Sequence, residues 1–225
     1  MRVLTWNLFH GRGVPVAGRD LRVEFASALA AWDWDVALLQ EVPPWWPPAL
    51  ARACGAAQST APTSRNAVLP LRRAVAERWP DVIKSNGGGA NAILVRGEIR
   101  EARRTRLRRW PERRVCHAVR LDDGTWCANL HAQVHSPQRA RADIERAAAA
   151  TLRWAGGEPC LLGGDFNVRS PSAPGFTALG GHGVDHVLGH DLAAAGPPEL
   201  PDRGQLSDHA PVLVTVVRRE VVPAG

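Results

Sequence analysis

The chain has 225 residues, 45% of which are hydrophobic, and a formal net charge of +6 at pH 7. This length is typical of one large domain, and this hydrophobic content is enough for a substantial core. No apolar run approaches the ~20 residues of a transmembrane helix, so the sequence predicts a protein without a membrane span. Because Met1 and Arg2 lead straight into a predicted strand that carries a motif residue, we expect no removable secretory signal, and the predicted compartment is the cytoplasm.

The cysteine pattern agrees with a reducing compartment. Cys54, Cys116, Cys127 and Cys160 include no C-x-x-C pair, and the last three lie in apolar, strand-like stretches. We interpret them as buried, reduced thiols, which argues against a zinc finger and against a disulfide framework. One alternative stays open, because Cys116 and Cys127 could face each other across a hairpin.

Arginine supplies nearly all of the positive charge, since Lys84 is the only lysine among 28 basic residues. GC-rich coding produces the same bias, so the clustering of the arginines is a better guide than the net charge. The segment 100–109 and the pair Arg113-Arg114 form a basic concentration. It is either a phosphate-binding surface or the solvated face of a strand, and the sequence does not separate the two.

Strands and helices alternate through the first third of the chain. Apolar spacing predicts strands at residues 3–8 and 36–40 and amphipathic helices at residues 21–32 and 71–79. The four prolines between positions 43 and 48 interrupt the chain. Trp45 and Trp46, which lie among them, are expected to pack a short helix or loop onto the core.

From residue 90 onward the pattern is mainly that of strands. The predicted strands cover residues 91–95, 98–107, 115–121, 126–134, 160–163, 184–188 and 212–217. Asp122-Asp123-Gly124 is typical of a hairpin turn. A long helix is predicted from Pro137 to about Trp154, with Ser136 as its N-cap and Gly156 at its end.

Two sheets packed face to face, with helices on both outer faces, accommodate this order of elements, since one sheet of so many strands would leave long edges. Periodicity alone does not distinguish this arrangement from an open, doubly wound sheet. We expect one domain over residues 1–219 and a C-terminal tail at residues 220–225.

Five polar fragments end apolar runs or directly precede one. They are Thr5-Trp6-Asn7, Gln40-Glu41, Asn129-Leu130-His131, Gly164-Asp165-Phe166-Asn167 and Ser207-Asp208-His209. Residues i and i+2 of a strand share a face, so Asp165 and Asn167 can point at the same reacting atom. From Met1 to about Val217, this order of fragments resembles the endonuclease/exonuclease/phosphatase superfamily, the deoxyribonuclease I-like metal phosphoesterases. The resemblance implies the four-layer α/β/β/α sandwich rather than a single sheet.

The resemblance also implies a hydrolytic site that contains a divalent metal. Phosphoester hydrolysis needs a cation that neutralises the phosphoryl oxygens, and Mg²⁺ prefers hard oxygen ligands. Glu41 is the candidate primary ligand, Asn7 would hold the water shell of the metal or the phosphate, and Asp208 would add a second carboxylate. The expected cofactor is Mg²⁺, with Mn²⁺ as the alternative.

The catalytic roles follow from the same resemblance. Asp165 would orient or deprotonate the attacking water, and Asn167 would donate to the developing oxyanion. His209 matches the essential histidine of the superfamily, and Asp185 matches the carboxylate that orients it. The choice of general base between Asp165 and His209 stays open. His131 would be a phosphate ligand or the general acid for the leaving group.

Three further residues are candidates for contact with the substrate phosphate. Asn91 lies in the segment Gly89-Ala90-Asn91-Ala92-Ile93-Leu94, which resembles a Gly-Asn-Ala-Ile-Leu segment of the family. His10 and Arg12 follow the first strand directly and could reach a phosphate from its loop. The abasic-site endonucleases lack the histidine at the position of His131 and use a tyrosine, whereas this chain contains no tyrosine. A deoxyribonuclease I-like, sphingomyelinase-like or phosphatase-like branch therefore fits better.

The sequence thus predicts a metal-dependent phosphoesterase whose partner is nucleic acid or another phosphoester substrate, and it indicates no protein partner. The first hypothesis is cleavage of phosphodiester bonds in nucleic acid. The second is a phosphatase or phosphodiesterase that acts on a small molecule or a lipid headgroup. The third, from another class, is a non-catalytic module that binds polyanions through its arginines.

Overall fold

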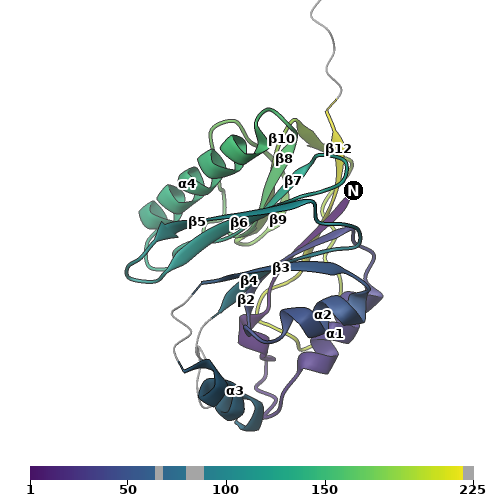
Figure 1. The fold of residues 1–225 in the computed structure, drawn as a ribbon, viewed down its shortest axis with the longest axis vertical. Helices are drawn as coiled ribbons and strands as arrows, with labels where there is room; N and C mark the ends of the chain where they lie inside the picture. Colours follow the sequence, from purple (N-terminus) through teal and green to yellow (C-terminus); the bar gives the residue numbers. More distant parts are fainter. Residues whose placement is uncertain (64–67, 80–88, 220–225) are drawn as a thin grey trace, which may run out of the picture.

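The computed structural model describes residues 1–63, 68–79 and 89–219, so the predicted tail at residues 220–225 lies outside the described residues. Within the described parts, two six-stranded sheets pack face to face and helices lie outside them, which confirms the predicted four-layer sandwich (Figure 1). The first sheet has the order β11 (Leu192–Ala194), β12 (Val212–Arg218), β1 (Arg2–Asn7), β2 (Val36–Val42), β4 (Ala90–Val95) and β3 (Ala57–Pro62). The second has the order β5 (Glu101–Arg108), β6 (Arg114–Arg120), β7 (Trp126–His131), β8 (Cys160–Asp165), β10 (Asp185–His190) and β9 (Thr177–His182). The helical elements are η1 (Phe9–Gly11), α1 (Arg22–Ala31), α2 (Pro47–Cys54), α3 (Leu69–Arg78) and α4 (Pro137–Ala155).

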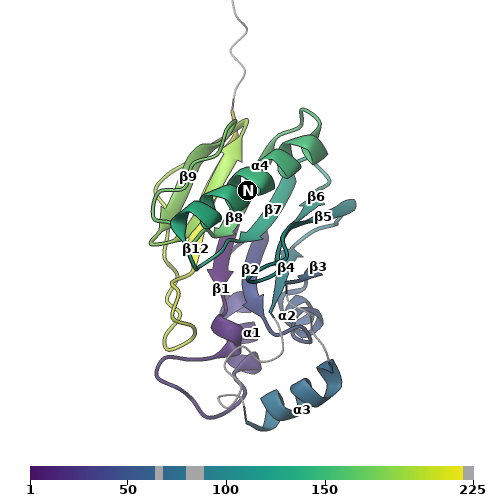
Figure 2. The ribbon, with the colours of Figure 1, turned by 90° about the vertical axis from the view of Figure 1, so that its left-hand side faces the viewer.

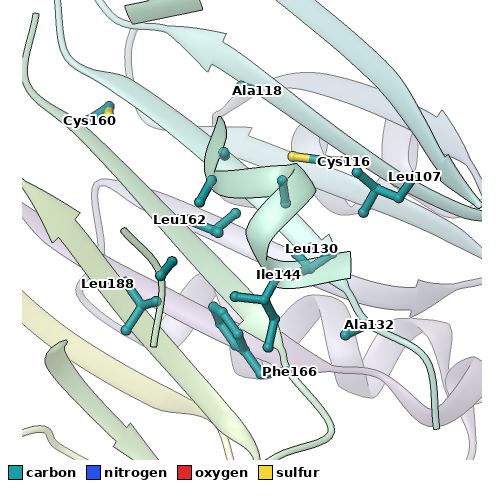
Figure 3. Close-up of a cluster of buried hydrophobic side chains, with 14 of the residues drawn as sticks. Leu107, Cys116, Ala118, Leu130, Ala132, Ile144, Cys160, Leu162, Phe166 and Leu188 are labelled. Carbon is teal, nitrogen blue, oxygen red and sulfur yellow. The ribbon is translucent and has the colours of Figure 1, made fainter. Parts of the chain in front are cut away.

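Helix α4 covers the outer face of the second sheet and lies across β7 and β8 (Figure 2). It begins as predicted, because the Ser136 side chain accepts a hydrogen bond from the backbone of the third helical residue and Pro137 occupies the first turn. It ends at Gly156, whose φ of 58° lies in the left-handed region. Ile144 contributes to the core beneath this helix together with Phe166 of the segment after β8 (Figure 3). No helix of the described chain has both the length and the apolar character that a membrane crossing requires.

Helices α1 and α2 cover the outer face of the first sheet (Figure 1). Their contact with the sheet is aromatic: the rings of Trp6 in β1 and Phe25 in α1 have centroids 5.0 Å apart. The expected element near Trp45 and Trp46 is α2, which Trp46 precedes directly. Trp46 is buried and its ring lies 5.6 Å from that of Phe25, so this short helix packs onto the core as predicted.

Most of the space between the two sheets is filled by apolar side chains, and the sheets approach closely at Gly163. Leu38 of the first sheet and Leu161 and Val187 of the second belong to the same buried cluster. A Cβ atom on Gly163 would lie 2.5 Å from Cδ1 of Leu38, so the absence of a side chain at this position lets the sheets approach each other. This close approach brings the polar ends of β2 and β8 near one another.

The four cysteines are free and buried, in agreement with the prediction of reduced thiols. The possible pairing of Cys116 with Cys127 is wrong. Cys116 belongs to the core beneath α4, whereas Cys127 belongs to the core between the sheets. In the β6–β7 pair Cys127 lies opposite Val119, and strand alternation directs the two thiols to opposite faces of the sheet.

Three strands were not predicted, and each lies at or beside a sheet edge. They are β3, β9 and β11, whose side chains are mostly exposed or half-buried. Their sequences, AQSTAP, TALGGH and LAA, do not show the apolar alternation of a half-buried strand. Pairing with a neighbouring strand therefore defines them as strands. The remaining predicted elements are present, with ends shifted by one to a few residues.

Candidate active site

The topology brings the polar ends of six strands to one end of the sandwich. β1 and β2 run parallel, as do β7 and β8, so the C-terminal ends of these four strands lie at the same end of their sheets. β10 and β12 run antiparallel to β8 and β1, so they begin at this end. The register places Asp185 opposite Asp165 and Asp165 opposite His131. Residues that are far apart in the sequence therefore lie close together, because they occupy the ends of neighbouring strands.

Asp165 lies at the centre of this group of strand ends and is almost completely buried. Its Oδ2 accepts a hydrogen bond of 3.0 Å from Nδ2 of Asn7, and its Oδ1 accepts one of 2.9 Å from the backbone of Asn167. Nε2 of His131 lies 3.5 Å from Oδ2. Burial raises the pKa of Asp165, against the opposing effects of the His209 charge and of the two hydrogen bonds. The carboxylate is therefore held in place by donors on both of its oxygens.

His209 and Asp185 form a hydrogen-bonded pair beside Asp165. Nδ1 of His209 lies 2.7 Å from Oδ2 of Asp185, while Nε2 lies 3.9 Å from Oδ2 of Asp165. Burial acts to lower the pKa of His209, but the hydrogen bond and charge of Asp185, with the charges of Asp165 and Asp208, outweigh it and raise the pKa to about 9. The pKa of Asp185 is raised to about 6 by burial. This pairing leaves Nε2 as the nitrogen that faces the centre of the site.

The loop that carries His209 is fixed by hydrogen bonds to β1. Oγ of Ser207 donates to the backbone oxygen of Asn7 at 2.7 Å and accepts from the backbone nitrogen of His209 at 3.0 Å. Nε1 of Trp6 donates to the backbone oxygen of His209 at 3.1 Å. These bonds connect the Ser-Asp-His fragment to the Trp-Asn fragment, about 200 residues away in the chain.

The titration of His209 predicts a pH dependence of stability in metal-free protein. A histidine whose pKa is raised from 6.5 to about 9 by folding stabilises the folded state fully below pH 6.5, and this stabilisation is lost as the pH rises to about 9. Asp185→Asn removes a main cause of the raised pKa. We expect the variant to lose less free energy of unfolding than the wild type between pH 6.5 and 9, as measured by denaturant titrations in EDTA. Equal losses in the two proteins would contradict this account of His209.

Glu41 points into the site from a distorted part of β2. Its φ is 49°, in the left-handed region, and the β2–β4 register shifts between Leu39 and Val42. Such a bulge redirects a side chain out of the regular strand pattern. Oε2 of Glu41 lies 3.1 Å from Nε2 of His10, and Oε1 lies 3.8 Å from Nε2 of His131. Burial raises the pKa of Glu41, while a hydrogen bond from Asn7 opposes this shift.

The charges around Glu41 suit a divalent cation. Burial lowers the pKa of His10 to about 4 and that of His131 well below its usual value, so both rings are neutral at pH 7 and do not balance the negative charges of Glu41 and Asp165. The buried carboxylate of Asp165, the half-buried carboxylate of Glu41 and the neighbouring carboxamide of Asn7 form the hard-oxygen environment that Mg²⁺ and Mn²⁺ prefer. The residues present therefore fit the expected metal.

A second group has metal-ligand spacing. Ligand atoms of Asp165, Asp185 and His209 all lie within 4.8 Å of one another. The Asp185–His209 contact in this group is a hydrogen bond of 2.7 Å. That bond occupies the ring nitrogen nearest to the carboxylate, so we regard Asp185 and His209 as an acid–base pair and Glu41 as the better candidate ligand.

Four predicted site residues occupy less central positions. Asp208 lies at the rim, with a side chain that is 44% exposed and 3.9 Å from Nε2 of His209. Asn167 donates from Nδ2 to the backbone oxygen of Ala132 at 3.1 Å. The other two are Asn91, which is fully buried and donates to the backbone oxygen of Val115, and Arg12, which lies over the ring of Phe9 at 4.0 Å.

Arg114 is a residue near the site that sequence reasoning did not single out. It begins β6 and is 6% exposed, and its Nε has no hydrogen-bond partner among the described residues. Nη2 of Arg114 pairs with Oε2 of Glu112 at 2.5 Å. Burial is the main reason for the low pKa of His131, and the positive charge of Arg114 adds to it. The sequence shows the arginine cluster that contains Arg114 but not which member faces inward.

Gln40 and Asn129 connect the two sheets directly behind the site. Nε2 of Gln40 donates to Oδ1 of Asn129 at 2.8 Å, and Nδ2 of Asn129 donates to the backbone oxygens of Leu39 and Ala92, each at 2.9 Å. Both side chains are fully buried. They precede Glu41 and His131 in the motifs Gln-Glu and Asn-x-His, so they position these residues rather than contact a substrate.

Comparison with known proteins identifies the family. The sequence profile of the Endonuclease/Exonuclease/phosphatase family matches residues 4–209. No curated protein matches the chain significantly in sequence.

Solved structures show the same fold at low sequence identity. The endonuclease/exonuclease/phosphatase from Beutenbergia cavernae is 17% identical, with a TM-score of 0.68 over 100% of this chain and 73% of that one. The mannosyl-6-phosphatase of Bacteroides thetaiotaomicron is 16% identical, with a TM-score of 0.69 over 96% and 99% of the two chains. The catalytic domain of human Nocturnin, with a bound sulfate, is 18% identical, with a TM-score of 0.68 over 97% and 94%. The family consists typically of hydrolytic, divalent-metal-dependent phosphoesterases. On the extent of the profile match, this chain belongs to the endonuclease/exonuclease/phosphatase family.

Proposed function

We propose that this protein is a divalent-metal-dependent phosphoesterase that cleaves phosphodiester bonds in nucleic acid. The observation that carries the proposal is the position of Asp165, whose carboxylate lies within 3.0 Å of Asn7 Nδ2, 3.5 Å of His131 Nε2 and 3.9 Å of His209 Nε2. Hydrolysis of a phosphoester needs a base or orienting group for water and donors for the phosphoryl oxygens in one place. These four side chains provide both.

The two acid–base groups have different protonation states. The raised pKa of His209 favours the protonated ring at neutral pH, so we assign it the role of a donor to a phosphoryl oxygen. Asp165 remains as the group that orients the attacking water and accepts its proton. His131, which is neutral because burial lowers its pKa, faces the same space and would contact the phosphate or the leaving oxygen. Asn167 would add an amide donor.

We propose that Glu41 and Asn7 hold Mg²⁺, or Mn²⁺ in its place, and that Asp208 contributes from the rim. A bound divalent cation would neutralise the charge of the phosphoryl group as it reacts. Arg114 would add to this neutralisation at the phosphoryl group, because its buried guanidinium carries a fixed positive charge near Glu41. His10 and Arg12 would approach the phosphate from η1 and the residue that follows it. Asn91 would act from the interior, as a support of the site.

Nucleic acid is the proposed substrate because exposed arginines are concentrated beside the site, on β5 and the loop that follows it. Arginine side chains bind phosphate backbones through charge and paired hydrogen bonds. The second candidate is a phosphatase for a small molecule or a lipid headgroup. The fold shared with a mannosyl-6-phosphatase over 96% of this chain supports that alternative. We also propose a single domain over residues 1–219 and a cytoplasmic location, which the buried free cysteines support.

Removal of divalent metal tests the proposed chemistry. We expect EDTA to abolish hydrolysis of plasmid DNA and of bis-p-nitrophenyl phosphate, and added Mg²⁺ or Mn²⁺ to restore both. Cleavage of DNA should weaken steeply as salt rises from low to physiological concentration, whereas hydrolysis of p-nitrophenyl phosphate should respond much less. Full activity in EDTA would refute the metal dependence. Hydrolysis of monoesters without any cleavage of diesters would favour the phosphatase alternative.

A further inference from the structure

The loop between β5 and β6 presents a tryptophan between arginines. Trp110 is 74% exposed, which makes it the most exposed large hydrophobic side chain of the described residues. Arg109 and Arg113 in the same loop are exposed, and within the described chain neither forms an ion pair. A single exposed hydrophobic side chain is common on protein surfaces. The combination of an exposed ring with two unpaired cations is more specific, because it is the pattern that binds unpaired nucleic acid.

The loop is anchored at its base and is not simply frayed. Nε of Arg108, the last residue of β5, donates at 3.1 Å to Oδ1 of Asp143, a fully buried residue of α4. Nε2 of Gln133, also fully buried, donates at 3.1 Å to the backbone oxygen of Glu112. Arg114 holds the side chain of Glu112 from the other end of the loop. The exposed ring is therefore presented by a segment that buried groups fix in place.

The same anchors place the loop beside the active site. Gln133 lies two residues after His131, and Arg114 is the next residue after Arg113. The charge of Arg114 acts on both His131 and Glu41. In Figure 1 the turn between β5 and β6 lies on the side of the sandwich opposite the N-terminus. β1 starts at the N-terminus and ends at Asn7 of the site. A polymer whose scissile phosphate sits at Asp165 has the loop as a neighbour.

The charges around Trp110 favour a polyanion. Glu112 is the only carboxylate of residues 109–113, and its oxygens lie 2.5 Å from Nη2 of Arg114 and 3.6 Å from Nε2 of His135. The exposed arginines continue along the edge strand β5 at positions 104 and 106, and these too form no ion pair within the described chain. An acidic backbone can therefore follow this edge without meeting an unpaired carboxylate.

We propose that residues 109–113 dock single-stranded nucleic acid, with Trp110 stacked on an unpaired base and Arg109 and Arg113 on the flanking phosphates. The face of an indole ring stacks on any base whose own face is free, and in a duplex the base faces are covered by their neighbours. An unpaired strand is therefore the form of nucleic acid that uses both the ring and the arginines. This inference rests on the proposed function and specifies the substrate class of the same site.

Binding and cleavage of a fluorescein-labelled single-stranded dodecamer test the inference. Binding is measured by anisotropy in EDTA, where no cleavage interferes. Trp110→Ala should raise Kd by roughly 5- to 150-fold, the range for loss of one base stacked on an aromatic ring. The double variant Arg109→Ala/Arg113→Ala should reduce the slope of log Kd against log salt by about 0.7 for each phosphate that these arginines neutralise in the wild type. The matched controls are Trp79→Ala, an exposed tryptophan on another segment, and Arg153→Ala, an exposed arginine at the far end of α4; both should bind as the wild type does.

The cleavage assay separates docking from a general defect. With Mg²⁺ present, Trp110→Ala should lower the ratio of kcat/KM for the dodecamer to kcat/KM for bis-p-nitrophenyl phosphate by the same factor as its affinity. An equal loss on both substrates would show that the loop only supports the fold of the site, and would overturn the inference. Unchanged binding by Trp110→Ala would overturn it as well, as would wild-type binding of the duplex dodecamer that is as tight as that of the single strand. A wild-type enzyme that binds the strand through Trp110 but hydrolyses no diester would instead defeat the proposed function and leave the docking surface supported.

Discussion

Asp165→Asn is expected to lower phosphodiester hydrolysis by about 10³-fold or more, measured as kcat/KM on bis-p-nitrophenyl phosphate and on DNA. A positioned acid–base group typically contributes 10²- to 10⁴-fold, and asparagine can neither accept a proton from water nor balance the charge of His209. The substitution is isosteric, so the hydrogen bonds from Asn7 and from the backbone of Asn167 are only partly disturbed. We therefore expect the loss to lie mainly in kcat.

The fold of this variant serves as its internal control. Burial raises the pKa of Asp165, which means that the folded protein holds the charged form at a cost. Removing the charge relieves this cost, so we expect the free energy of unfolding in EDTA to change by about 1 kcal/mol, the typical size for a single substitution. Asp33→Asn is the matched control, because the Asp33 side chain is 84% exposed and pairs with Arg2, at the opposite end of β1 from Asn7. Asp165→Asn that keeps wild-type activity would refute the proposed site.

His209→Ala is expected to cause a loss of similar size, about 10³-fold in kcat/KM, because it removes the donor that Asp185 holds at the centre of the site. Asp185→Asn leaves the ring in place but removes the carboxylate that orients it. It should therefore cost less, about 10- to 100-fold, which is the range for carboxylates that orient a histidine bound to a metal. A larger loss for His209→Ala than for Asp185→Asn would identify His209 as the donor and Asp185 as the residue that orients it.

The matched control for this prediction is His182→Ala, since the side chain of His182 is exposed and forms no hydrogen bond or ion pair with the described residues. It should leave activity unchanged. If His209→Ala and Asp185→Asn cost the same, the pair would act as a unit and the separate assignment of the donor would fail. If neither variant loses activity, the site lies elsewhere.

Local sequence determines most of the framework. β1, β2, β8 and β12 are strands of six or seven residues that contain the predicted apolar runs, and they lie where hydrophobic spacing predicts them. Helix α4 is marked at both ends, by Ser136 with Pro137 and by Gly156. Edge strands are different, because they bury little and carry no required pattern. For this reason β3, β9 and β11 could be found only from their hydrogen-bonded neighbours.

The candidate site shows the same division. The residues of the five motifs could be named because each belongs to a polar fragment at a strand end, in an order that resembles a known family. Their convergence is a property of the fold. Asn7 donates to Asp165, which is 158 positions away in the sequence, because two pairs of parallel strands end at the same end of the sandwich. The bulge that turns Glu41 inward leaves no mark in the local sequence.

The sequence by itself determined the alternation of elements, the burial of the four thiols and the identity of the polar residues at the strand ends, because these depend on side-chain chemistry and on spacing along the chain. Only the tertiary structure decided that Arg114 points to the site while Arg113 points to solvent, and that Cys116 and Cys127 lie in different cores. Neighbouring residues of a strand face opposite sides, so a shift of one residue in register exchanges the inner and outer side chains. The register is set by pairing with strands that are distant in the sequence, and no local pattern records it.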